Sequence, residues 1–301
     1  MWVVLALVSA SLLGLYDVFK KQSLKDNAVV PVLFFNTLFC ALFFLPSIAG
    51  SMSGAIEVGS PFHIPEGGLR EHLLVMMKSV IVLSSWICGY FAIKRLPLTI
   101  VGPVNATRPV MTLIGAMLIF GERLNLLQWC GVGTSILSFW LLSRSGKKEG
   151  IDFKSNVWVL SLVAAAMLGA MSGLYDKYLM SASGAGLDRL FVQGWYNVYQ
   201  MIIMGMIVLV MWWPDRNSSP FHWKWTIPLI SVALTAADLA YLYALALPGA
   251  MISIVSMIRR SSVLVSFVFG AFVFHEKNIR SKAMDLLLVL VSLLLLLLGT
   301  L

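Results

Sequence analysis

Long apolar stretches recur along the whole chain and limit what it can fold into. Each is about 17 to 26 residues long with few charges, and a helix of that length spans the hydrocarbon core of a bilayer. We therefore expect about ten transmembrane helices. They cover Trp2–Phe19, Val29–Ile48, Leu73–Ile93, Leu98–Phe120, Leu126–Leu142, Val157–Met180, Leu190–Trp212, Trp225–Leu247, Gly249–Phe274 and Ala283–Leu301.

The composition agrees with a lipid environment. Of the 301 residues, 59% are hydrophobic and 12% are charged, whereas soluble domains have about 45–50% apolar and about 25% charged residues. Backbone groups in lipid must pair within their own segment, and these stretches are too long and too uniformly apolar for barrel strands. The predicted fold class is an all-α integral membrane protein. The net charge of +8 comes with no basic run interleaved with aromatics, so no nucleic-acid partner is expected.

Short motifs repeat in the same order in the two halves of the chain. Gly14-Leu15-Tyr16-Asp17 recurs as Gly173-Leu174-Tyr175-Asp176, and at a similar offset Arg108 matches Arg259. The polar segment Arg144–Lys154 reads as the linker. We predict two five-helix repeats, residues 1–145 and 155–301. Because five is odd, the second repeat is inverted relative to the first, as in many secondary transporters.

The positive charges indicate an orientation. With these spans, 14 of the 22 Lys and Arg residues lie in odd-numbered connections and four in even-numbered ones. The positive-inside rule places the odd connections in the cytoplasm and both termini outside. The expected location is the plasma (inner) membrane, crossed many times.

Charged residues deep within the spans are the first candidates for a binding site, because they are costly in lipid. Arg108, Arg259 and Arg260 are expected to line a central cavity and hold an anionic group, with Asp238 and Asn105 completing the site. A guanidinium suits a carboxylate or phosphate because it donates two parallel hydrogen bonds. The alternative is an internal ion pair between Asp238 and one arginine that only joins helices.

Three prolines at intervals of six residues mark the fourth span: Pro97 directly before it, and Pro103 and Pro109 within it. Proline removes a backbone donor and disturbs a helix, so this span is predicted to be kinked or interrupted. Freed carbonyls could face a cavity beside Asn105 and Arg108, or the kink could be satisfied by neighbouring helices.

The repeated motif supplies two matched pairs, Tyr16 with Asp17 and Tyr175 with Asp176. We interpret them as gates, one near each membrane face. Interfacial tyrosine anchors with solvated ion pairs are the alternative interpretation.

No enzyme is predicted. Two membrane aspartates resemble an aspartyl protease dyad, but such a dyad must share a proton. Asp17 and Asp176 end spans of opposite direction, about 30 Å apart. No metalloprotease, serine hydrolase or phosphate-binding motif is present in the sequence, and no metal or cofactor is expected.

The chain resembles the EamA-type members of the drug/metabolite transporter superfamily. The resemblance rests on Leu96-Pro97, the prolines that follow, Gly121-Glu122-Arg123-Leu124, and a glycine-bearing fifth span with Gly131 and Gly133. In the second half His275-Glu276 replaces Gly-Glu and the ninth span has no internal proline. The resemblance implies export or exchange of small metabolites by alternating access.

Together these observations predict a secondary transporter, an exporter or exchanger, of a small anionic or zwitterionic metabolite. Its partners would be that substrate, the lipid bilayer and, if Asp238 serves proton antiport, H⁺. A membrane scaffold or binding subunit without transport is the alternative. The sequence gives no indication of oligomeric state.

Overall fold

A computed structural model gives the architecture. It describes residues 2–120, 125–147, 151, 153, 155–180, 184–246, 258–259, 261–274 and 279–299, and within these the chain is helical with no β-strand. Some residues that the sequence analysis singled out lie outside the described residues, namely Arg260, Gly121–Leu124 and His275–Glu276.

Most helices coincide with predicted spans. They are α1 (Trp2–Leu24), α2 (Val29–Met52), α3 (Leu69–Arg95), α4 (Leu98–Ala106), α5 (Arg108–Phe120), α6 (Leu126–Lys147), α7 (Val157–Met180), α8 (Arg189–Ile207) with a π-helical turn η1 (Val208–Trp212), α9 (Thr226–Ala246), α11 (Ser262–Phe272) and α12 (Ile279–Leu298). The fourth span, however, is divided into α4 and α5, and of the ninth span the structure describes α11, which covers only its second half.

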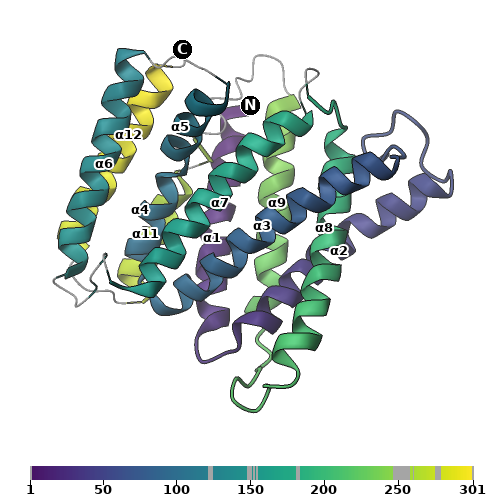
Figure 1. Cartoon of the computed structure of the whole chain (residues 1–301), viewed down its shortest axis with the longest axis horizontal. Coiled ribbons are helices and arrows are strands. Elements are labelled where there is room, and N and C mark those ends of the chain that lie inside the picture. The colour runs from purple at the N-terminus through teal and green to yellow at the C-terminus, as the bar shows by residue number, and fades with distance from the viewer. Residues whose placement is uncertain are drawn as a thin grey trace.

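Helices that are distant in the sequence pack as pairs. The main partners are α1 with α9, α3 with α7, α2 with α8, and α6 with α12. Figure 1 shows α6 and α12 side by side at one edge of the bundle and α2 and α8 at the other, with α1, α3, α7 and α9 between them. Helix α1 begins and α12 ends at the same end of the bundle (Figure 1).

Several helices suit a bilayer. Among the described residues, five helices are long and apolar enough to cross a membrane, namely α1, α2, α3, α7 and α8 with η1. Shorter apolar helices lie in α6, α9 and α11. Large apolar side chains are exposed along the outside, such as Val4, Leu126 and Ile136. Contact with lipid tails explains why such side chains are not buried in protein.

The fourth predicted span is interrupted, as its prolines predict. Helix α4 ends at Ala106 and α5 begins at Arg108, with only Thr107 between them. The Thr107 side chain donates to the carbonyl of Val104 over 2.7 Å, and its backbone N–H donates to the same oxygen. The break is therefore satisfied locally, and it places Asn105 and Arg108 on either side of a non-helical residue.

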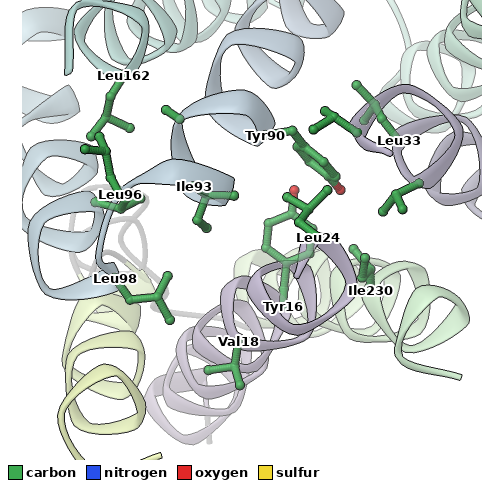
Figure 2. Close-up of a cluster of buried hydrophobic side chains, with 14 of the residues drawn as sticks. Tyr16, Val18, Leu24, Leu33, Tyr90, Ile93, Leu96, Leu98, Leu162 and Ile230 are labelled. Carbon is green, nitrogen blue, oxygen red and sulfur yellow. The ribbon is translucent and has the colours of Figure 1, made fainter. Parts of the chain in front are cut away.

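The main apolar core lies between α1, α3, α4 and their partners in the second half of the chain. Figure 2 shows buried leucines and isoleucines from several helices around Tyr16 and Tyr90, whose rings extend toward one another from α1 and α3. Both tyrosines are buried. Their polar ends therefore lie inside the bundle, where a hydroxyl needs a partner from the protein or a ligand.

Candidate functional site

A cavity of about 180 Å³ lies where α1, α3, α4 and α5 meet α9 and α11. Its polar lining contains three charged side chains, Asp17, Lys20 and Arg108. The complete lining is Leu13, Tyr16, Asp17, Lys20, Ser85, Trp86, Gly89, Tyr90, Val101, Gly102, Asn105, Arg108, Leu234, Ser262 and Val263. The space thus combines one polar region with an apolar wall, as sites for small molecules commonly do.

Lys20 and Asp17 form an ion pair within one helix. They lie three residues apart on α1, and Lys20 Nζ is 2.9 Å from Asp17 Oδ1. The second oxygen of Asp17 accepts a hydrogen bond from Ser266 Oγ of α11 over 3.3 Å. The ammonium of Lys20 also lies 4.3 Å from the ring centre of Tyr16 and 5.1 Å from that of Tyr90. Aromatic faces attract a cation at these distances, so the lysine is stabilised on several sides.

Arg108 is different, because it forms no ion pair with the carboxylates that the structure describes. Its Nε is buried without a hydrogen-bond partner. The guanidinium rests on α7 at Gly169, where an added Cβ would lie 2.9 Å from Cζ. Only a residue without a side chain allows this close approach.

One further polar atom in the cavity lining, the side-chain oxygen of Asn105, is buried without a partner. The hydroxyl of Tyr90 is also buried and lies within hydrogen-bonding reach of the Tyr16 side chain. A half-turn of the Asn105 amide would exchange its oxygen and nitrogen, so this side chain can offer a ligand either an acceptor or a donor. Buried polar groups normally find partners, so this set is suited to a polar ligand.

The second predicted arginine makes the alternative contact. Arg259 is ion-paired with Asp238 of α9 and lies 4.6 Å from the ring centre of Tyr241. Asp238 also lies 3.5 Å from the side-chain nitrogen of Gln193 on α8. Arg259 and Asp238 are not among the residues that line the cavity around Arg108.

The repeated motif of the second half also differs from its counterpart. Asp176 of α7 pairs with Lys78 of α3, with Nζ 2.8 Å from Oδ1. Lys78 Nζ lies 4.7 Å from the ring centre of Tyr196, and the hydroxyl of Tyr175 donates to the backbone of Leu74 over 3.2 Å. This pair therefore joins two helices, whereas Asp17 and Lys20 belong to one.

The structure thus brings together residues to which the sequence gave separate roles. Tyr16 and Asp17, interpreted as a gate, line the same cavity as Asn105 and Arg108. Tyr175 and Asp176 lie at the contact of α7 with α3.

Sequence reasoning missed Lys20, Trp86 and Tyr90 as cavity residues. One signal was available for the tyrosine: Tyr90 and Tyr241 are separated by 151 residues, as are Arg108 and Arg259. In both places the structure puts the tyrosine near the arginine, since Tyr90 and Arg108 line one cavity and Tyr241 contacts Arg259.

Comparison with known proteins agrees with this architecture. The model of the EamA-like transporter family matches residues 1–144. An uncharacterised transporter encoded in the cobO 3′ region of Sinorhizobium sp. is 30% identical over 132 residues, which are 44% of this chain and 88% of that protein. A crystal structure with 12% sequence identity superposes with a TM-score of 0.57, covering 98% of this chain and 94% of the other, and it supports the fold alone. This is a family of membrane transporters rather than enzymes, and the chain belongs to the EamA-like transporter family.

Proposed function

We propose that the protein is a secondary transporter, an exporter or exchanger, that moves a small anionic or zwitterionic metabolite by alternating access. The observation that carries the proposal is Arg108, a cation without a described counter-ion that lines a cavity at the break between α4 and α5. A membrane-embedded charge is costly, so an unpaired one is expected to serve a ligand.

The architecture of two inverted five-helix repeats, 1–145 and 155–301, is part of this proposal. The helix contacts support it. If α1, α3 and α5 are exchanged with α7, α9 and α11, the contact of α1 with α9 becomes that of α7 with α3. Likewise the contact of α1 with α11 becomes that of α7 with α5. All four contacts occur in the structure.

The remaining candidates have roles in the same scheme. Arg259 would bind the substrate once its ion pair with Asp238 opens, together with Arg260, which follows it in the sequence. The coupling would be either proton antiport through Asp238 or plain exchange of substrates. The pairs at Asp17 and Asp176 would act as gates in the two halves of the bundle.

The proposed location is the plasma (inner) membrane, with the connections from α1 to α2 and from α8 to α9 in the cytoplasm. Lysines on this side support the orientation: Lys94 donates to the carbonyl of Asn27 over 2.6 Å, and Lys224 to that of Gln22 over 3.2 Å. Trp223 and Trp225 flank Lys224 in the sequence and contact each other, and tryptophans are common at a membrane interface.

Flux measurements on Arg108 variants test the proposal. The purified full-length chain is reconstituted in proteoliposomes, and uptake of a panel of radiolabelled small monoanions and zwitterions is followed. Losing a charge-assisted hydrogen bond costs about 1.5–3 kcal/mol, so Arg108→Ala is expected to lower the flux about 10- to 100-fold, and Arg108→Lys less.

Arg216→Ala is the matched control, because Arg216 is exposed in the connection between α8 and α9. It should transport like the wild type. Flux that survives Arg108→Ala unchanged would refute the assigned site. Absence of flux for every compound would favour the scaffold function.

A further inference from the structure

The charges of the cavity distinguish between the two substrate classes that the proposed function allows. Its charged lining residues are Lys20, Arg108 and Asp17, two cations and one anion. A zwitterion needs a carboxylate for its ammonium group, and an anion needs only a cation. The question is therefore whether Asp17 is available to a ligand.

Both oxygens of Asp17 already have partners. Oδ1 holds Lys20 at 2.9 Å, and Oδ2 accepts from the hydroxyl of Ser266. Lys20 is 7% exposed, and the rings of Tyr16 and Tyr90 lie against its ammonium. The pair is thus enclosed and neutral, and a second ammonium group would approach it with two cations already nearby.

The groups left for a ligand form a defined set. Arg108 supplies a positive charge with no described carboxylate within ion-pair distance. The Asn105 side chain supplies a neutral hydrogen-bonding atom without a partner, and the buried Tyr90 hydroxyl, beside the Tyr16 side chain, supplies another neutral group. One cation matches one negative charge, so a carboxylate fits better than a phosphate monoester, which carries nearly two. The neutral atoms match a hydroxyl group near that carboxylate.

The rest of the lining limits the body of the ligand. Leu13, Trp86, Val101 and Val263 form an apolar wall. The volume of about 180 Å³ lies below the 300–1,000 Å³ or so of pockets for drug-sized ligands. A short aliphatic or branched side chain matches this wall and this space.

We propose that the substrate is a small hydroxy monocarboxylate, and that the Lys20–Asp17 pair excludes the amino acid of the same carbon skeleton. The inference rests on the proposed function and narrows it. Arg108 binds the carboxylate, Asn105 and Tyr90 bind the hydroxyl, and the apolar wall contacts the side chain. Lys20 acts as a specificity-determining residue because it occupies the carboxylate that an ammonium group would need.

Matched pairs of substrates test the inference in the wild-type protein. Lactate is compared with alanine, and 2-hydroxyisocaproate with leucine, as substrates and as competitors in proteoliposomes that contain the full-length chain. Each pair differs only at the 2-position. The hydroxy acid should be preferred by about tenfold or more, because an unpaired buried charge is strongly rejected.

Lys20→Met provides the second arm, since it frees Asp17 for an ammonium group. The preference should shift toward alanine and leucine by about tenfold, whereas Lys25→Met, at an exposed lysine of the same chain segment, should keep the wild-type preference. If Lys20→Met does not fold, the wild-type comparison still decides.

The two hypotheses fail in different ways. Preference of the wild type for the amino acids, with a flux that depends on Arg108, would overturn the inference and leave the proposed function intact. An unchanged preference in folded Lys20→Met would also overturn it. Absence of Arg108-dependent flux for every compound would remove both.

Discussion

The position of Arg108 depends on an absent side chain on a neighbouring helix. Gly169 of α7 faces the guanidinium, and an added Cβ would lie 2.9 Å from Cζ and 3.1 Å from Nε. These separations are below ordinary van der Waals contact, so one methyl group would move the guanidinium by a few tenths of an ångström. Gly173, one turn further along α7, has open space around it.

This contrast gives a matched pair of variants. Gly169→Ala is expected to lower the flux of the Arg108-dependent substrate about three- to tenfold, because small displacements at a binding site are costly. Gly173→Ala should leave the flux unchanged and raise helix stability by up to about 1 kcal/mol. Proteoliposome flux and thermal unfolding in detergent measure the two effects. Equal fluxes in both variants would mean that Gly169 does not position the arginine.

The sequence identified those site residues whose charge is costly to place in an apolar span. Arg108 and Arg259 stand out because a charge in an apolar span needs a reason. The sequence offered Asp238 as a partner for one arginine but did not indicate which one: Asp238 pairs with Arg259, while no described carboxylate lies within ion-pair distance of Arg108. Lys20 was missed as a cavity residue because it lies near a helix end, where a lysine normally reaches water.

At the scale of elements, two kinds of ion pair occur in the bundle. Lys20 and Asp17 share α1, while Lys78 of α3 and Asp176 of α7 hold different helices together. The side chain of Lys78 is 7% exposed and that of Asp176 is 35% exposed. Removal of the carboxylate therefore leaves a buried ammonium, whereas removal of the lysine leaves a partly solvated carboxylate.

A double-mutant cycle measures this interhelical pair. Asp176→Asn is expected to destabilise the protein by about 1–3 kcal/mol, below the value for fully buried pairs because water screens Asp176. Lys78→Met should cost less, and the double variant should recover part of the loss. Asp215→Asn, at an exposed position between α8 and α9, is the control. Strictly additive effects in thermal unfolding would show that the two groups do not interact.

The sequence predicted that the fourth span is interrupted, but it did not predict the residue at which the helix breaks. Prolines at 103 and 109 indicate a disturbed helix. The break falls at Thr107, whose hydroxyl and N–H both bond to Val104. Side-chain capping of this kind is a local competition that the proline pattern alone does not resolve.

At the scale of the whole molecule, the apolar stretches predicted most of the helices. Backbone groups in lipid must be hydrogen-bonded within the protein, and stretches of this length achieve that as helices. The helix pairs were less accessible. Contacts such as α1 with α9 join residues more than 200 positions apart, and only the repeated motifs hinted at them. The proposed orientation follows from the distribution of Lys and Arg among the connections.

Cysteine labelling tests the orientation. Ser53 follows α2 and Ser218 lies between α8 and α9, and both are exposed. In a background without the native cysteines Cys40, Cys88 and Cys130, Ser218→Cys should react with a membrane-impermeant maleimide only after the membrane is opened. Ser53→Cys should react in intact cells. The reverse pattern would invert the proposed topology, and labelling of both from one side would contradict the span assignment.

The placement of Lys20 and Asp17 on a single helix has a mechanical consequence. When α1 tilts or slides as a rigid helix, both charges move together and their separation is kept. The charge that this pair presents to the cavity is then the same in each conformation of the transporter. A shift between α3 and α7 instead pulls Lys78 and Asp176 apart. A shift of α3 against α7 would therefore break an ion pair, while the Lys20–Asp17 pair that lines the cavity beside Arg108 would stay intact.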